Sequence, residues 1–373
     1  MTHHIAHKKV TWLELFYDLI YVAAISITAH VLTHAHHGAI DASIILKYTL
    51  IFVPLWWAWT GFTVYVNRFG KDDTAQRINY FVQMAFVIVM AASINVDFEA
   101  YYLYFMIGYV GIRLSTVWMY ARIWKNGKSE PRSIARFLTL SFLVGALISF
   151  SSVLLPDDWK FIALYAGIFL DIVLPLIGRR ILVRLPVHHP HLLERYGLVT
   201  IILLGEMILV IVNGLREETV TISTVVAALI GFVMAVAIWW HYFESSEHTA
   251  EEEQKNSGQL VIYGHLFMYM SLGIIASVVH YGFHHDLSVR NFGWLAWSGF
   301  GLYTLSAALV FHQRAKSKRQ RVFAFYMPAG LLVVAAVVLL MLPTVTAVYA
   351  ALAGCFVVQA LLVVVGLRGK GLR

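Results

Sequence analysis

The sequence predicts an all-α polytopic membrane protein of about twelve transmembrane helices, arranged as two parallel six-helix halves. Three observations predict this fold class. Of the 373 residues, 60% are hydrophobic and 13% are charged, whereas soluble domains have roughly 45–50% apolar and about 25% charged residues. The apolar residues fall into runs of about 20, the length that spans hydrocarbon as a helix. Lysine and arginine are concentrated in alternate loops, as in membrane proteins with a fixed topology.

Twelve apolar segments satisfy the length requirement. In chain order they are Trp12–Leu32, Tyr48–Val66, Ile78–Asn95, Tyr102–Ile123, Phe137–Leu155, Phe161–Ile177, Leu193–Asn213, Val220–Phe243, Leu260–Tyr281, Phe292–Phe311, Val322–Leu342 and Thr344–Leu367. The last two segments meet at Pro343, so we expect them to form a tight hairpin.

The positive charges predict the topology of these segments. If the N-terminus is cytoplasmic, the outer loops hold only Lys47, Lys160, Arg216 and Arg290, and the inner loops and C-terminal tail hold far more Lys and Arg. This distribution predicts an even number of spans with both termini in the cytoplasm. The net charge of +7 then reflects topology and contact with anionic lipid. Nucleic-acid binding is not expected, because no basic cluster lies on a soluble domain.

A weak internal repeat divides the chain into halves at 1–190 and 191–373. Trp56-Trp57 and Trp239-Trp240 lie 183 positions apart, and each pair comes late in a helix that runs from outside to inside. Six spans per half is an even number, so the halves would run parallel, with any shared cavity between them. The alternative is chance, because aromatic pairs are common near membrane interfaces.

Ionisable residues inside the predicted spans are the candidates for chemistry. Glu14 and Asp18 lie one helical turn apart and share a face, which should look into protein or water because charge facing lipid is costly. Arg113, Asp171 and His265 lie at comparable depth in their own helices. Arg113 could pair with Asp18 or with Asp171. Such a pair would brace two helices, or Arg113 would bind an anionic group or gate a carboxylate.

Glu206 is the sharpest single candidate. It lies about twelve residues into its predicted helix, close to the bilayer midplane. Burial there favours the protonated form, which is the condition for a proton carrier. The alternative is a protonated side chain that donates one interhelical hydrogen bond. Glu194 lies at the cytoplasmic end of the same helix, where an acid also fits the helix dipole.

Aromatic and histidine residues extend the set of site candidates. Trp56, Trp57 and Trp59 lie deep enough to form the wall of a cavity for an aromatic or cationic solute, although packing explains them as well. His241 could line an inner vestibule or extend to the interface. No metal site and no cofactor are expected, because no helix pairs histidine and carboxylate at ligand spacing and the chain has one cysteine.

Two acidic motifs carry a resemblance to a known family. The segment Glu14–Val22 (ELFYDLIYV) resembles the opening signature of the bacterial low temperature requirement protein A family, and Glu194–Glu206 (ERYGLVTIILLGE) resembles a later one. Trp56–Trp59 followed by Asn67-Arg68-Phe69 fits the same pattern. The resemblance covers most of the chain. It implies a multi-span protein of the bacterial inner membrane, associated by name with growth in the cold, and it implies no particular reaction or substrate.

These observations favour a secondary transporter of a small solute. Proton coupling through Glu206 or Asp18 would drive it, with Arg113 as counter-ion or anion ligand. Its partners would be the lipid bilayer, the solute and H⁺. Walker, dinucleotide, HExxH and GxSxG motifs do not occur, so ATP-driven transport by this chain is not expected. One alternative is a membrane-embedded enzyme that acts on lipid or a lipid-linked substrate through Glu14 and Asp18. The other is a non-catalytic membrane or sensor protein.

Overall fold

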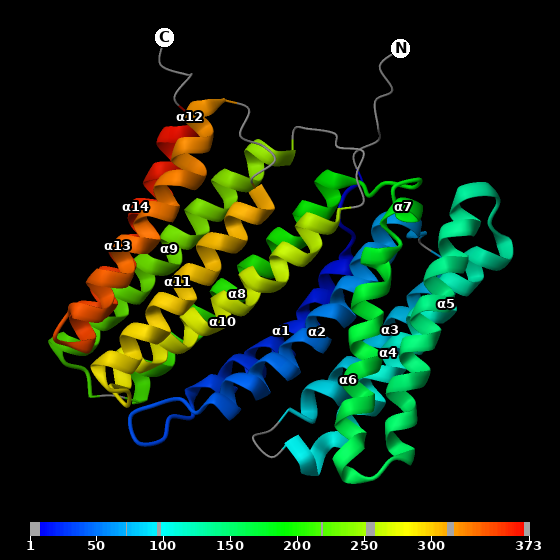
Figure 1. Ribbon diagram of the computed structural model, residues 1–373, viewed down its shortest axis with the longest axis horizontal. Coiled ribbons are helices and arrows are strands. Elements are labelled where there is room, and N and C mark those ends of the chain that lie inside the picture. The colour runs from blue at the N-terminus through cyan, green and yellow to red at the C-terminus, as the bar shows by residue number, and fades with distance from the viewer. Residues whose placement is uncertain are drawn as a thin grey trace. The chain divides into compact units, whose positions relative to one another are not determined.

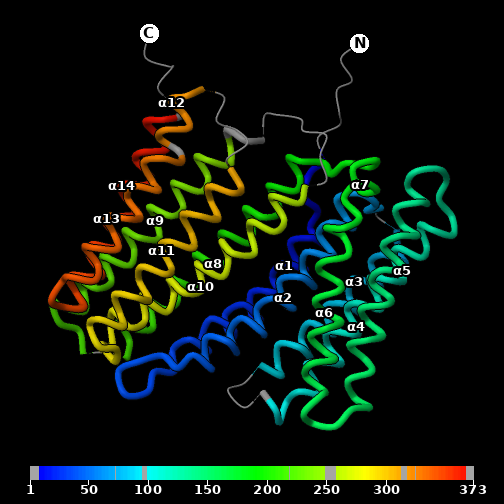
Figure 2. The backbone as a smooth tube through the Cα atoms, in the orientation of Figure 1, coloured from blue at the N-terminus to red at the C-terminus, as the bar shows by residue number. Residues whose placement is uncertain are grey.

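The computed structural model describes residues 8–71, 73–94, 98–217, 219–250, 258–311 and 317–368, and within these ranges the chain forms helices and no β-strand (Figure 1). Figure 2 traces the same path. The α-helices are α1 Trp12–His30, α2 Ala42–Phe69, α3 Thr74–Ala92, α4 Phe98–Asn126, α5 Ser129–Ser151, α6 Asp157–Ile177, α7 Arg179–Leu182, α8 His189–Glu217, α9 Ile222–Ala250, α10 Gln259–His284, α11 Val289–Phe311, α12 Lys318–Arg321, α13 Met327–Met341 and α14 Val345–Arg368.

In the described part of the chain, ten helices are long and apolar enough to cross a membrane by length and composition: α1, α2, α3, α5, α6, α8, α9, α10, α11 and α14. Large apolar side chains on these helices stay exposed, such as Leu19 at 60%, Phe169 at 63% and Leu229 at 58%. Such exposure suits contact with lipid, whereas a soluble protein rarely exposes large contiguous apolar patches. The chain is therefore a multi-pass helical membrane protein.

Two of the twelve predicted spans fall outside this set, each for a physical reason. The span at Tyr102–Ile123 corresponds to α4, whose many tyrosines and central Arg113 lower its hydropathy. The span at Val322–Leu342 is not one α-helix. It divides into a π-helical turn, Val322–Tyr326, and the 15-residue α13. Pro328 at the start of α13 lacks an N–H and crowds the preceding turn, which fits the wider π geometry there.

By its internal contacts the chain divides into two compact units. Unit 1 comprises Met1–Ile27, Ile51–Arg195 and Glu253–Gln259, and unit 2 comprises the remaining segments from Thr28 onward. Helices α1, α2, α8 and α10 each contribute residues to both units. The units therefore follow a different division from the halves 1–190 and 191–373, and the parallel duplication of those halves stays a prediction.

Small residues let the helices of unit 1 pack closely. Helix α3 packs on α4, α4 on α5, and α5 on α6. A Cβ added to Gly145 of α5 would lie 2.9 Å from the carbonyl oxygen of Gly167 in α6, and one added to Gly167 would lie 2.6 Å from the backbone nitrogen of Ser149. Glycine at both positions thus permits backbone contact between α5 and α6, as small residues do in membrane helix pairs.

Glycine also permits close helix packing in unit 2. Helices α9 and α14 lie side by side, and α11, α13 and α14 pack together (Figures 1 and 2). A Cβ on Gly293 of α11 would lie 2.8 Å from the carbonyl oxygen of Leu339 in α13. The predicted hairpin is confirmed, because α13 ends at Met341 and α14 begins at Val345.

A helix cap fixes the start of α3. Asp73 accepts a hydrogen bond from the backbone N–H of Gln76 at 2.8 Å, which satisfies one of the free donors in the first turn of α3. This bond holds the pKa of the Asp73 carboxyl below its ordinary value, with further help from Arg122 at 3.5 Å. In the predicted topology, this cap lies on the cytoplasmic side of unit 1, where several basic residues gather.

Candidate functional site: a buried cluster of two acids, one arginine and one histidine

The site begins at the N-terminal cap of α1. The backbone N–H of Thr11 donates to Glu14 Oε2 at 2.7 Å, and the Thr11 hydroxyl lies 3.1 Å from the same oxygen. The Glu14 N–H in turn donates to the Thr11 hydroxyl at 3.3 Å. This is a capping box, which the sequence Thr-Trp-Leu-Glu encodes. It fixes the Glu14 side chain so that only 2% of the residue is exposed.

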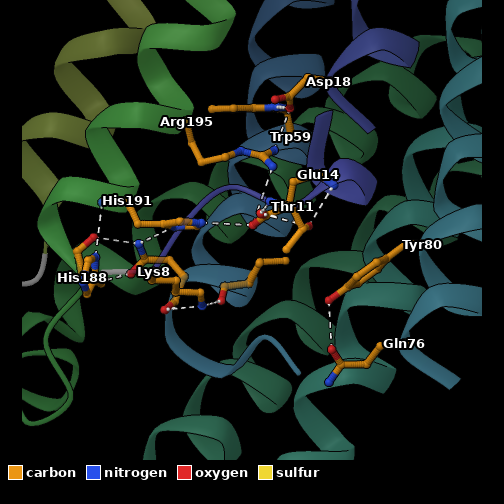
Figure 3. A network of polar contacts seen from close by, with 12 residues as sticks. Lys8, Thr11, Glu14, Asp18, Trp59, Gln76, Tyr80, His188, His191 and Arg195 are labelled. Atoms are coloured by element: carbon orange, nitrogen blue, oxygen red, sulfur yellow. Dashed lines mark hydrogen bonds and ion pairs between the residues drawn. The ribbon is translucent and has the colours of Figure 1, made fainter. Parts of the chain in front are cut away.

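Arg195 of α8 joins the two acids of α1 (Figure 3). Its Nη2 lies 2.6 Å from Asp18 Oδ1, and its Nη1 lies 3.7 Å from Glu14 Oε1. The indole N–H of Trp59 also donates to Asp18 Oδ1 at 2.7 Å. All of these groups belong to unit 1, and Arg195 is fully buried. The predicted placement of Glu14 and Asp18 on one protein-facing side of their helix is therefore found.

His191 completes what we call the acid–arginine cluster: Glu14, Asp18, His191 and Arg195. Its Nε2 lies 3.2 Å from Glu14 Oε1, and its Nδ1 lies 3.2 Å from Asn67 Nδ2. The amide of Asn67 is oriented by His188, because Asn67 Nδ2 donates to the His188 carbonyl at 2.9 Å and Asn67 Oδ1 accepts the His188 N–H at 2.8 Å. Asn67 thus presents a donor to Nδ1, which favours a neutral imidazole with its proton on Nε2.

The charges of this cluster do not balance. Glu14 and Asp18 supply two negative charges, Arg195 supplies one positive charge, and His191 is neutral in the arrangement above. Lys8 is a further cation that interacts with Glu14, and its ammonium is already bonded to the carbonyl oxygens of Val66 and Asn67 at the end of α2. Burial lowers the pKa of Lys8, and the charge of Glu14 opposes that shift. A buried excess of negative charge is costly.

Arg113 forms a second buried ion pair in unit 1, and its partner is Asp171. Arg113 Nε lies 2.8 Å from Asp171 Oδ2, the Tyr109 hydroxyl donates to the same oxygen at 3.0 Å, and both charged side chains are 0% exposed. The guanidinium carbon lies 4.3 Å from the centre of the Phe142 ring. Of the two acids predicted as partners of Arg113, Asp171 is the one that pairs with it. Asp18 pairs with Arg195 instead.

Polar side chains lie between the two ionic groups. The Tyr17 hydroxyl donates to Gln83 Oε1 at 3.0 Å, and Gln83 Nε2 lies 3.4 Å from the Thr116 hydroxyl. Tyr17 precedes Asp18, and Thr116 lies one turn after Arg113. Unit 1 therefore contains a buried polar row that runs from the acid–arginine cluster towards the Arg113–Asp171 pair.

The tryptophan candidates are buried in unit 1, and two of them contact these charges. Trp56, Trp57 and Trp59 are each 3–4% exposed. Trp59 bonds to Asp18, and the Trp57 ring centre lies 5.7 Å from the guanidinium carbon of Arg113. Their role as a cavity wall stays a prediction.

The remaining candidates belong to unit 2 or to the surface. His265 is buried, with Nε2 2.9 Å from the Tyr242 hydroxyl and Nδ1 2.7 Å from the Val261 carbonyl. His241 is buried, with Nδ1 2.9 Å from the Tyr303 hydroxyl. Glu206 is half-buried, and its Oε2 is buried without a hydrogen-bond partner. Glu194 is exposed, although it adjoins Arg195. Across the described residues, no three His, Cys, Asp or Glu side chains are grouped so as to hold a metal ion.

Sequence reasoning missed Arg195 and His191 as site residues. The predicted topology places His191 in a cytoplasmic loop and Arg195 at the cytoplasmic end of the helix that follows, where positive charge is explained by topology. The signal that points to them is the need for a cation, because two acids one turn apart on a buried face require one. Arg195 also lies within the second acidic motif, beside Glu194.

Fold and site together define a multi-pass helical membrane protein with ionic groups buried among its helices. The chain matches the family of the bacterial low temperature requirement A protein (LtrA) over residues 9–365, nearly its whole length, and it belongs to that family. It is similar to a protein of Rhizobium meliloti (strain 1021) described as "Uncharacterized protein RA0937", with 27% identity over 313 residues that cover 81% of this chain and 75% of the relative. No solved structure is a significant match to the chain.

Proposed function

We propose that the protein is a proton-coupled secondary transporter of a small solute in the bacterial cytoplasmic membrane, and that the acid–arginine cluster is its proton-binding site. The observation that carries the proposal is the charge balance of the cluster, in which Glu14 and Asp18 share the single guanidinium of Arg195. Proton binding makes the cluster neutral, and proton release leaves it with one negative charge. A buried site with these two states is a proton carrier of the kind found in transport pathways.

Access to the cluster supports the same proposal. Glu14 lines an open pocket of about 810 Å³ whose other walls come from the start of α1, the end of α2 and the start of α3. Its carboxylate therefore lies at the boundary between this pocket and the buried interior of unit 1. Protons reach the cluster through the pocket.

The proposal includes twelve spans with both termini in the cytoplasm. Helix α4 has 29 residues, which gives it a length of roughly 43 Å, enough to cross a bilayer. The π-helical turn and α13 together cover Val322–Met341, which is the length of one span. The positive charges of the alternate loops support this topology.

The substitution Glu14→Gln is expected to remove the proton-binding site. Without the Glu14 charge, Asp18 and Arg195 balance each other and no proton is needed. In a titration of the purified protein across the neutral pH range, the wild type should take up about one proton more than the variant. The matched control is Glu194→Gln, which removes an exposed acid from α8. Equal proton uptake by wild type and Glu14→Gln would contradict the proposal.

Glu206 is tested separately because it lies in unit 2. In liposomes that contain a pH-sensitive dye, wild-type protein should move protons when pools of amino acids, sugars or organic cations are added outside. Glu206→Gln is expected to reduce that movement at least tenfold if the unpartnered carboxyl is a second proton site. Unchanged movement would remove Glu206 from the pathway. A wild type that moves no protons with any pool would favour the non-catalytic alternative, in which the buried charges only hold the helices together.

A further inference from the structure

The open pocket beside Glu14 has a second property that transport does not require. Among the residues that the structure describes, its wall carries four cationic side chains, from Lys8, Lys9, Lys71 and Arg77, and one carboxylate. That carboxylate, Glu14, already faces Arg195 and His191. We call this the basic pocket. Its described lining therefore carries a net positive charge, and these lining residues all belong to unit 1.

Three of the four cationic side chains that line the pocket also have an exposed surface. Lys9, Lys71 and Arg77 are exposed, whereas the ammonium of Lys8 is held by backbone carbonyls of α2. The Asp73 cap holds the first turn of α3, which carries Arg77. A cavity of about 810 Å³ lies in the size range of small-molecule sites.

The other side of the basic pocket is apolar and faces outward. Trp12 is 88% exposed, Phe16 is 45% exposed and Phe81 is 49% exposed, and all three line the pocket. The apolar surface continues along α1 to Leu19, one turn beyond Phe16 and 60% exposed, and on α3 to Ile78, which is 57% exposed. Cations at one end and exposed aromatic residues at the other match an amphipathic anion, whereas a free soluble anion requires the cations alone.

We propose that the basic pocket binds the headgroup of an anionic phospholipid. The phosphodiester lies against Lys9 and Lys71, and the acyl chains run along Trp12, Phe16 and Phe81. Basic pockets between membrane helices at the cytoplasmic surface recognise anionic lipids in this way. This lipid site does not depend on the proposed transport activity, because binding is measured without proton movement.

The test compares lipid binding by matched variants of the full-length protein in detergent. Lys9→Gln with Lys71→Gln removes two exposed cations of the pocket. Lys125→Gln with Lys128→Gln removes two exposed lysines of the next cytoplasmic loop, as the predicted topology has it, outside the pocket. Phosphatidylglycerol, phosphatidylcholine and inorganic phosphate are titrated against each protein, and bound lipid is counted by native mass spectrometry.

Wild type and the Lys125/Lys128 control should bind phosphatidylglycerol equally, and the pocket variant should bind it roughly 30-fold more weakly. Phosphatidylcholine should bind weakly to all three proteins. The proposal is overturned if both double variants lose binding equally or if the two lipids bind alike. Displacement of phosphatidylglycerol by millimolar inorganic phosphate would identify a free-phosphate site and would overturn the lipid proposal as well.

Discussion

Replacing Arg195 with methionine should lower the free energy of unfolding by about 3–5 kcal/mol, the cost of leaving buried charge without its partner. The variant retains much of the volume of the side chain, so the loss reports the charge. Glu14 and Asp18 would then be two buried carboxylates without a guanidinium between them. Denaturation of the purified protein in detergent micelles measures the change.

The pH dependence of this variant has a defined sign. Protonation of Glu14 and Asp18 removes the uncompensated charge, so the destabilisation should shrink as the pH falls and grow as it rises. Arg195→Lys keeps the charge but lacks the fork that reaches both acids, so it should be intermediate. Arg180→Met is the matched control, because Arg180 is exposed. A loss below 1 kcal/mol for Arg195→Met at neutral pH would show that the cluster is not a tight ionic group.

The Arg113–Asp171 pair should behave as a brace, with a loss of about 3–5 kcal/mol for Arg113→Met alone. The double variant, Arg113→Met with Asp171→Leu, should regain most of that stability, because apolar side chains of similar volume replace buried ion pairs at little cost. The two single variants and the double variant form a mutant cycle, measured by the same denaturation assay.

Measuring proton movement shows whether the Arg113–Asp171 pair also takes part in transport. If the double variant is stable and keeps the wild-type proton movement in liposomes, Arg113 and Asp171 only join α4 to α6. A stable double variant without proton movement would place the pair in the pathway. The cycle would contradict the brace if the double variant is no more stable than Arg113→Met.

Much of the membrane architecture follows from hydropathy and charge. Runs of apolar residues locate the helices because each span must satisfy its own backbone in hydrocarbon. The same reasoning fails at Val322–Leu342, where local backbone geometry around Pro328 divides the segment. It also cannot decide whether α4 spans the bilayer, because tyrosine and Arg113 reduce hydropathy whether a helix faces lipid or protein.

The sequence predicts part of the candidate site, namely which buried charges need a partner, but it does not predict which residues they contact. A shared face for Glu14 and Asp18 follows from helical spacing, and the need of Arg113 for an acid follows from the cost of burying charge. Which acid it takes does not follow, because Asp18 and Asp171 lie at similar depth and only helix packing decides between them. The roles of Arg195 and His191 depend on contacts between segments more than 170 positions apart in the chain, which spacing within one helix does not reveal.

The capping box at Thr11 gives the start of α1 an additional property. One oxygen of Glu14 holds the first turn of the helix, and the other faces His191 and Arg195. A proton that settles on this carboxyl weakens an acceptor that the Thr11 amide uses. The stability of the first turn of α1 is thereby linked to the charge state of the acid–arginine cluster. The capping box is strongest when Glu14 is ionised and weaker when Glu14 is protonated.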